Sequence, residues 1–155
     1  TTEIYTLSLH DALPICAEVY YHKDKNSKSG NAQRNYAIDL VLRSQPAPAF
    51  DNFVYFLDDD TLLHPQFYNA VNGLKNDFIH FNQQNPDGSH RIGGTVKVNQ
   101  IDSGNALISR NIIGNIRWRS DLYNADGFFL QAVFQKALNP VYLPQFLSTY
   151  NALQK

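Results

Sequence analysis

A short apolar run that ends in three consecutive carboxylates constrains this chain more than any other feature. The run is FVYFL, residues 53–57, and Asp58, Asp59 and Asp60 come directly after it. A continuous apolar run of this length is typical of a strand that is buried on both faces. In sheets built from such strands, ligands bind at the carboxyl ends of the strands. We therefore expect the three carboxylates at a functional edge of a sheet, rather than on a solvated helix.

Segments with strand and helix character alternate along the rest of the chain. Strands are predicted for residues 17–24, 53–57, 77–83, 104–110 and 140–144, and helices within residues 26–43, 64–74 and 124–138. Turn signals at Asp87-Gly88 and Gly93-Gly94 predict a hairpin or loop between the third and fourth strands. This alternation indicates an α/β fold with a mainly parallel sheet that is flanked by helices.

Composition limits the classes of function that need to be considered. The 155 residues suit one domain, and 43% hydrophobic with 17% charged residues is a globular composition. A formal net charge of −1 without a basic run argues against nucleic-acid binding. No apolar stretch approaches the ~20 residues of a membrane-spanning helix. The single Cys cannot form an internal disulfide, which favours a reducing, cytoplasmic location.

The N-terminal segment TTEIYTLSLHDALPIC, residues 1–16, differs in character from the rest of the chain. It resembles the translated read-through of a sequencing adapter, of the kind found at the ends of metagenomic gene models. The alternative interpretation is an ordinary N-terminal strand and turn. We interpret residues 1–16 as non-native and residues 17–155 as the folded domain.

The three carboxylates could serve metal chemistry. Adjacent like charges raise one another's pKa, and a bound divalent cation removes that cost. Mg²⁺ and Mn²⁺ prefer such oxygen ligands and often bind one or two carboxylates together with substrate phosphates. In an extended segment Asp58 and Asp60 would point the same way and could share one ion. The alternative is a polar loop whose last Asp caps the next helix along the chain.

Four segments together resemble the nucleotide-sugar glycosyltransferases of the GT-A fold. The acidic segment FVYFLDDDTLLHPQFY resembles their Asp-x-Asp segment, and GNAQRNYAI resembles an Arg-Asn-x-Ala segment found in family 2 and in the glucuronyltransferases. Downstream, IDSGNALISRNIIGNIRW is similar to the strand on the acceptor side, and YNADGFFLQAV to the segment that bears the catalytic carboxylate. The resemblance covers residues 17–153 and implies a GT-A, Rossmann-like fold.

The resemblance also implies roles for single residues. Donor binding would involve Gly30, Asn31, Arg34, Asp58 and Asp59, and the Mn²⁺ or Mg²⁺ ion would be held by Asp58 and Asp60. Asp126 would be the general base, with Asp102 and Asp121 as rivals, because a sugar hydroxyl attacks well only as its proton leaves. Gly104, Asn105 and Trp118 would line the acceptor site, although a sole Trp is equally typical of a core.

Taken together, these features predict a metal-dependent, inverting glycosyltransferase that is truncated at its N-terminus. The first β-α units of the family, about 60 residues, would be absent, so this fragment need not be active by itself. The expected donor is a UDP-sugar and the expected acceptor a glycan or polysaccharide. Peripheral attachment to the inner membrane and self-association through an exposed sheet edge are further expectations.

Three alternatives stay open at this point. A non-catalytic sugar- or nucleotide-binding domain would share the same acidic segment. Phosphohydrolases with an Asp-x-Asp-x-Thr segment are a second alternative, but Thr61 comes one position too early for that pattern. Retaining transfer is the third, because the sequence contains no stereochemical marker.

Overall fold

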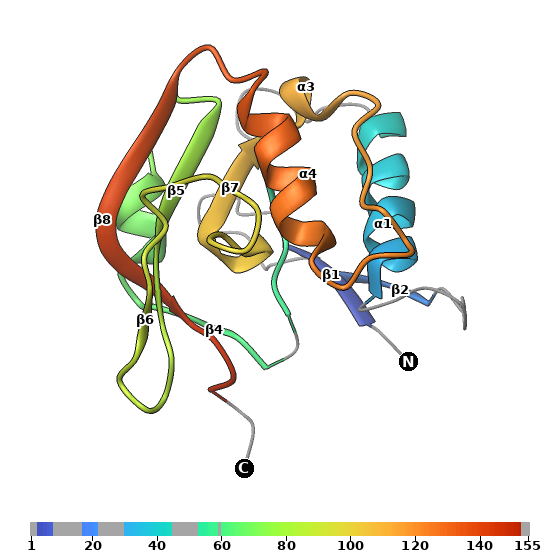
Figure 1. Ribbon diagram of the computed structural model, residues 1–155. Coiled ribbons are helices and arrows are strands. Elements are labelled where there is room, and N and C mark those ends of the chain that lie inside the picture. The colour runs from blue at the N-terminus through green and yellow to red at the C-terminus, as the bar shows by residue number, and fades with distance from the viewer. Residues whose placement is uncertain (1–2, 8–16, 22–29, 45–52, 59, 153–155) are drawn as a thin grey trace.

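The computed structural model describes residues 3–7, 17–21, 30–44, 53–58 and 60–152. Its elements, in chain order, are β1 (Glu3–Leu7), β2 (Ala17–Tyr21), α1 (Asn31–Arg43), β3 (Phe53–Tyr55), β4 (Leu62–Leu63), α2 (Phe67–Val71), β5 (Phe78–Gln84), β6 (His90–Arg91), the 3₁₀ helix η2 (Ser103–Asn105), β7 (Ala106–Ser109), α3 (Arg110–Ile113), α4 (Ala125–Phe134) and β8 (Pro140–Thr149). The expected alternation of strands and helices is therefore present, and the fold is mixed α/β (Figure 1).

A mixed, curled sheet of six strands organises the molecule. Its strand order is β3-β7-β5-β8-β4, and β6 pairs with β5 outside this path. Only the β5–β8 pair is parallel among the described pairings; β3–β7, β5–β7, β4–β8 and β5–β6 are antiparallel. The expectation of a mainly parallel sheet is thus wrong for the described strands. The connection from β5 to β7 contains no crossover helix, so the chain turns back and β7 runs antiparallel to both of its neighbours.

The central strand β5 is buried on both faces of the sheet. Phe78, on one face, joins a core that includes residues of α1, α3 and α4. Ile79 and Phe81 belong to a second core, to which α2 contributes Phe67. This burial is consistent with the closely spaced apolar residues Phe78, Ile79 and Phe81, which favoured a strand in the sequence. In the view of Figure 1, α4 lies between β7 and α1, and the long strand β8 runs beside β5.

Local sequence explains how the two longer helices, α1 and α4, begin. Gly30, with φ of 71°, precedes the first turn of α1 in a left-handed conformation that glycine adopts without steric cost. Helix α4 buries one face, through residues that include Phe129, Leu130 and Val133, and carries Asp126 in its first turn. A carboxylate at this end of a helix is favoured by the helix dipole.

Strands β3, β5 and β8 run in the same direction, because β3 and β5 are each antiparallel to β7 and β8 is parallel to β5. Their carboxyl ends therefore meet at one edge of the sheet, where the sequence predicted a site. On its outer side, β3 has no partner among the described strands.

Strands β1 and β2 form a separate antiparallel pair, with Glu3 opposite Tyr21. The interpretation of residues 1–16 as non-native stays a prediction. None of the helices in the described part of the chain is long and apolar enough to cross a membrane.

Candidate functional site

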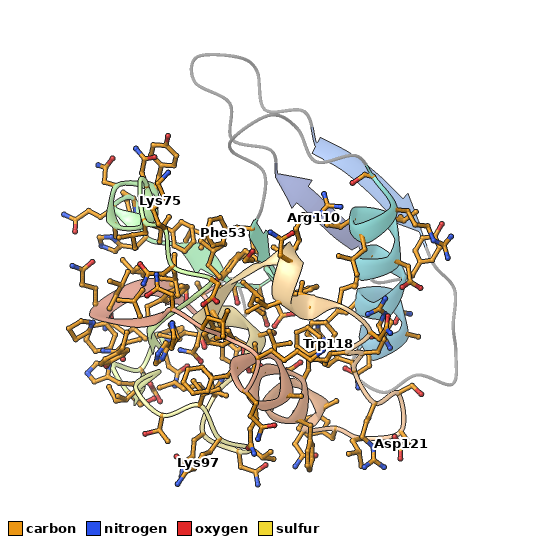
Figure 2. The ribbon with its side chains drawn as sticks, turned by 90° about the horizontal axis from the view of Figure 1, so that it is seen from above. Phe53, Lys75, Lys97, Arg110, Trp118 and Asp121 are labelled. Atoms are coloured by element: carbon orange, nitrogen blue, oxygen red, sulfur yellow. The ribbon has the colours of Figure 1, made fainter. Side chains whose placement is uncertain are left out.

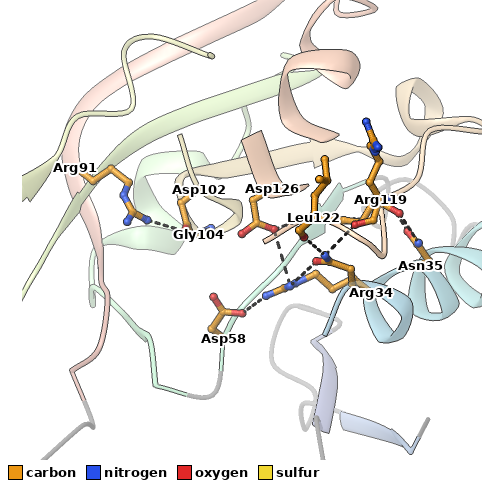
Figure 3. Close-up of polar contacts among 11 residues, drawn as sticks. Arg34, Asn35, Asp58, Arg91, Asp102, Gly104, Arg119, Leu122 and Asp126 are labelled. Atoms are coloured by element: carbon orange, nitrogen blue, oxygen red, sulfur yellow. Dashed lines mark hydrogen bonds and ion pairs between the residues drawn. The ribbon is translucent and has the colours of Figure 1, made fainter. Parts of the chain in front are cut away.

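Three aspartates from separate parts of the chain meet at the edge where β3, β5 and β8 end. Asp58 comes after β3, Asp102 caps η2, and Asp126 lies in the first turn of α4. Figure 3 shows Arg34 reaching from α1 toward Asp58 and Asp126, with Asp102 nearby. Two of these aspartates, Asp58 and Asp126, were predicted site residues, and Asp102 was a rival for the role of base.

Arg34 bridges the acidic segment and helix α4. Its Nη2 atom donates to Asp58 Oδ1 over 2.5 Å, and its Nη1 atom lies 3.9 Å from Asp126 Oδ1. The Arg34 side chain is only 14% exposed. Solvent screens such an enclosed ion pair less than one on the surface, so each partner strongly affects the charge of the other.

The electrostatics of this bridge leave an excess of negative charge. Burial raises the pKa of Asp58, and although Arg34 opposes that shift, the charges of Asp102 and Asp60 add to it. Burial alone would lower the pKa of Arg34, but the charges of Asp126 and Asp58 outweigh burial and raise it. Arg34 therefore stays charged, and a second cation near these carboxylates would be stabilised.

Asp126 is held in place by the only Trp. The indole Nε1–H of Trp118 donates to Asp126 Oδ1 over 2.7 Å, and the indole ring stacks on Phe129 with centroids 3.5 Å apart. Burial raises the pKa of Asp126, although Arg34 and the indole hydrogen bond act in the opposite direction. A carboxylate whose pKa is raised toward neutrality is better suited to accept a proton.

Asn31 joins the start of α1 to the segment before α4. Its Nδ2 atom donates to the backbone oxygens of Arg119 and Leu122 over 3.0 and 2.9 Å, and its Oδ1 accepts from Arg34 Nη1 over 3.4 Å. The residue is 1% exposed. Gly30 and Asn31 thus shape the turn that presents Arg34, and direct donor contact by either residue stays a prediction.

Asp102 is fixed by its neighbours in the chain and by Arg91. Its Oδ1 accepts from Gly104 N over 2.9 Å, and its Oδ2 lies 2.6 Å from Arg91 Nη1. The side-chain Oδ1 of Asn105 accepts from Asp102 N over 3.2 Å, and its Nδ2 donates to the backbone oxygen of Phe81 over 3.0 Å. Asn105 is fully buried, and through its hydrogen bond to Asp102 N it positions Asp102. Its predicted contact with an acceptor would have to be indirect.

Gly104 occupies a position that no larger residue could take without movement. A Cβ atom there would lie 2.5 Å from Nε2 of the buried Gln83. The backbone oxygen of Gly104 accepts from the hydroxyls of Tyr55 and Ser148, over 3.0 and 3.1 Å. The glycine therefore lets η2 pack closely against the ends of β5 and β8, and its role in acceptor binding stays a prediction.

Sequence reasoning missed Arg91 and Tyr150. The guanidinium of Arg91 lies 5.3 Å from the centroid of the Tyr150 ring, as in a cation–π contact. Burial raises the pKa of Tyr150, and the charges of Asp102, Asp60 and Asp58 raise it further. The charge of Arg91 acts in the opposite direction. Both residues thus face the acidic site, from β6 and from the turn after β8. No local pattern marks either residue, because only the strand order brings them here.

Asp121 lies on the surface, whereas Trp118 takes the core position that the sequence left open as its alternative. Asp121, a rival for the base, is 65% exposed at its side chain and pairs with Arg119 over 3.1 Å, so it does not join the site. Trp118 is only 3% exposed and lies in the core between α1 and α4 (Figure 2). Its ring face is covered by Phe129, so it acts on the site through its indole N–H.

The acidic segment turns rather than continuing as a strand. Strand β3 ends at Tyr55, and Thr61 N donates to the backbone oxygen of Asp58 over 3.0 Å, which closes a turn. Strand alternation therefore does not set the directions of Asp58 and Asp60, contrary to the expectation from the sequence. Asp60 remains near enough for its charge to help raise the pKa of Asp58, behind the larger effect of burial. Asp59 lies outside the described residues.

The described residues alone do not form a complete set of metal ligands. In the described part of the chain, no group of three or more His, Cys, Asp or Glu side chains is arranged to hold a metal. Two carboxylates, Asp58 and Asp60, are nevertheless the number that Mg²⁺ or Mn²⁺ commonly takes when phosphates and waters supply the rest. The donor set thus fits an ion that binds together with a diphosphate.

Comparisons with known proteins bear on the fold. No protein-family model matches the sequence, and a search of curated proteins gives no match. Among solved structures, the crystal structure of S. aureus TarS, a glycosyltransferase, matches with a TM-score of 0.52 and 13% identity over 77% of this chain. The match covers 24% of the TarS chain, so this chain spans about a quarter of the length of that protein.

The similarity to TarS and the mixed α/β sheet are consistent with a glycosyltransferase-like fold. At 13% identity the comparison speaks for the fold alone. What the acidic edge binds has to be argued from its own residues.

Proposed function

We propose that this chain carries the site of a metal-dependent glycosyltransferase of the GT-A type, similar to family 2. The reaction would transfer a sugar from a nucleotide-sugar, most simply a UDP-sugar, to a glycan or polysaccharide acceptor. The observation that carries the proposal is the bridge by Arg34 between Asp58 and Asp126, at the strand ends of a glycosyltransferase-like fold. Because the chain spans a quarter of TarS, activity is proposed for the protein to which this domain belongs.

On the donor side, the residues around Asp58 would receive the diphosphate. Arg34 would pair with phosphate oxygens, since a guanidinium matches phosphate geometry. Asp58 and Asp60 would hold Mn²⁺ or Mg²⁺, and the resemblance places Asp59 near the ribose or the sugar. When bound, the ion would stabilise negative charge on the departing diphosphate.

On the acceptor side, Asp126 would act as the general base of an inverting transfer. Trp118 holds Oδ1, and we assign Oδ2 to take the proton from the acceptor hydroxyl. The hydroxyl oxygen would form its bond to the anomeric carbon as the bond to the nucleoside diphosphate breaks. Asp102, fixed by Arg91 and Gly104, would orient the acceptor from the opposite side.

Calorimetric titration with UDP, with and without Mn²⁺, tests the donor side of this proposal. We expect binding to the wild-type protein that requires Mn²⁺ and that Asp60→Ala abolishes. Asp77→Ala is the matched control, because Asp77 accepts from the backbone of Leu138 and Asn139 at the opposite end of β5. Metal-independent binding, or binding that Asp60→Ala leaves unchanged, would contradict the proposal.

The same samples distinguish the alternatives. Release of UDP from a UDP-sugar, lost in Asp126→Asn, would support the transferase. Binding of UDP without any turnover would favour the non-catalytic binding domain. Release of inorganic phosphate from a phosphate ester would favour the phosphohydrolase.

A further inference from the structure

Arg34 occupies a position that a bound cation would also affect. Its guanidinium contacts Asp58 over 2.5 Å on one side and approaches Asp126 to 3.9 Å on the other. The three side chains are 14%, 27% and 22% exposed, respectively. Figure 3 shows that this single side chain connects the segment after β3 with the start of α4.

The guanidinium is held in this position by its surroundings. Asn31, one turn earlier on α1, accepts from Arg34 Nη1 and is itself anchored to the backbone at Arg119 and Leu122. The Trp118 ring lies 5.9 Å from the Arg34 guanidinium carbon. The bridge is therefore a built part of the fold, unlike an exposed ion pair that forms and breaks freely.

The Arg34 guanidinium lies 2.5 Å from Asp58 Oδ1, so it already neutralises part of the negative charge that Asp58 would offer to a metal ion. The Arg34 guanidinium and a divalent metal ion would therefore compete for the negative charge of Asp58. A diphosphate would change this balance, because its oxygens offer the guanidinium another anionic partner at the same edge of the sheet.

We propose that Arg34 competes with the divalent cation for Asp58, and that a nucleoside diphosphate relieves this competition by drawing the guanidinium to its phosphates. This inference rests on the proposed function and adds how the two ligands depend on each other. The cation and the nucleotide then bind cooperatively, and Arg34 carries the coupling between them. Release of Arg34 also frees Asp126 from its nearby positive charge only once the donor is in place.

Such coupling is reciprocal and measurable. If UDP raises the affinity for Mn²⁺ by a given factor, Mn²⁺ raises the affinity for UDP by the same factor, and couplings between sites are typically about 5- to 150-fold. Calorimetry with Mn²⁺ alone, UDP alone, and each in the presence of the other measures both factors. We expect a factor of at least about 5 in the wild-type protein.

Arg34→Gln removes the competing charge. We expect it to bind Mn²⁺ alone more tightly than the wild-type protein does and to lose most of the coupling to UDP. Arg34→Lys retains a cation and should restore part of the coupling, which separates loss of charge from loss of fold. Arg117→Gln is the matched control: it breaks the 2.6 Å pair with Asp39, also on α1 but away from the acidic edge, and should leave both factors unchanged.

Two results would overturn the inference, and they differ in what they say of the proposed function. Unchanged Mn²⁺ affinity and unchanged coupling in a folded Arg34→Gln protein would refute the competition while leaving the nucleotide site intact. Failure of the folded wild-type protein to bind Mn²⁺ or UDP in any combination would contradict both the competition and the proposed function.

Discussion

Among single residues, Trp118 shows most clearly how burial determines the chemistry of this site. Its ring packs on Phe129, and its indole N–H is the hydrogen-bond donor to Asp126. Because the Asp126 side chain is only 22% exposed, the loss of this donor would leave a largely enclosed carboxylate without one of its stabilising contacts. The residue that the sequence suggested for stacking on a sugar instead supports the proposed base.

Trp118→Phe should therefore destabilise the protein in a pH-dependent way. Phe retains much of the packing but cannot donate to Asp126, so we expect a loss of about 1–3 kcal/mol in the free energy of unfolding at pH 7. The variant also raises the pKa of Asp126 further, because the indole hydrogen bond lowers it. The cost should shrink at low pH, where Asp126 is protonated. Urea denaturation at pH 7 and at about pH 3, below the ordinary Asp pKa of about 3.9, measures both, and an equal cost at the two pH values would contradict the assignment.

A second residue, His80, makes the stability of the sheet sensitive to mild acid. Burial lowers the pKa of His80, although its hydrogen bond to the Gly93 carbonyl acts against the shift. The unfolded chain, with an ordinary His pKa of about 6.5, then binds a proton before the folded protein does. The free energy of unfolding should fall as the pH drops from 7 through that value, and should stop falling below the folded pKa.

His80→Asn tests this effect, since its amide can still reach toward Gly93 but does not titrate. The variant should lose part of the slope of stability against pH between about 7 and 5.5, whatever its stability at pH 7. Thermal denaturation across that range gives the slope. Equal slopes for the two proteins would show that His80 does not set it.

At the scale of elements, helix α4 is positioned by close contact with a loop. A Cβ on Gly127 would lie 2.8 Å from the Cα of Val98, and Gln131 accepts from Val98 N over 3.2 Å. Asn124, just before the helix, bonds to Asn99 over 2.9 Å. The loop thus holds the turn that presents Asp126.

Gly127→Ala should be destabilising, although Ala favours a helix over Gly by about 1 kcal/mol. The added methyl group meets backbone rather than a flexible side chain, so we expect a net loss of about 1–3 kcal/mol from overpacking. Chemical denaturation checks the sign. An increase in stability would mean that the loop yields easily and does not hold α4.

Elements with a local signature could be predicted from the sequence, whereas those that depend on distant partners could not. The closely spaced apolar residues of β5 and the apolar face of α4 are local features, and both elements were predicted within a few residues. Strand β8 extends to Thr149, well beyond the predicted end at Pro144. Its register with β5 shifts between Leu143 and Phe146, and such an irregularity accommodates a proline inside a strand.

The site residues also fall into those that a local pattern indicates and those that only the strand order brings together. Asp58 and Asp126 could be proposed because each sits at the end of an element with a clear pattern. The pairing of Arg91 with Asp102, and the approach of Tyr150, required β7 to run antiparallel beside β5 and β8 to lie on the other side of β5. Local periodicity contains no information on strand order, so the sequence did not mark Arg91 or Tyr150.

At the scale of the whole molecule, the outer edge of β3 is expected to promote association between copies of the domain. This edge has no partner among the described strands, and unpaired strand edges promote association. Light scattering should therefore give a mass that rises above 17.6 kDa with concentration. A constant monomer mass over the full accessible range would show that the edge is not available for pairing.

The proposed function requires one edge of this molecule to bind a nucleoside diphosphate and a cation beside Asp58 and Asp126. The chain has one Trp, so its indole N–H gives a single, unmistakable NMR signal from a group bonded to Asp126. Adding Mn²⁺ with UDP should broaden that signal strongly, while the amide signal of Leu138, at the opposite end of β5, persists. An indole signal that stays sharp while other signals broaden would place the ion elsewhere and contradict the proposed site.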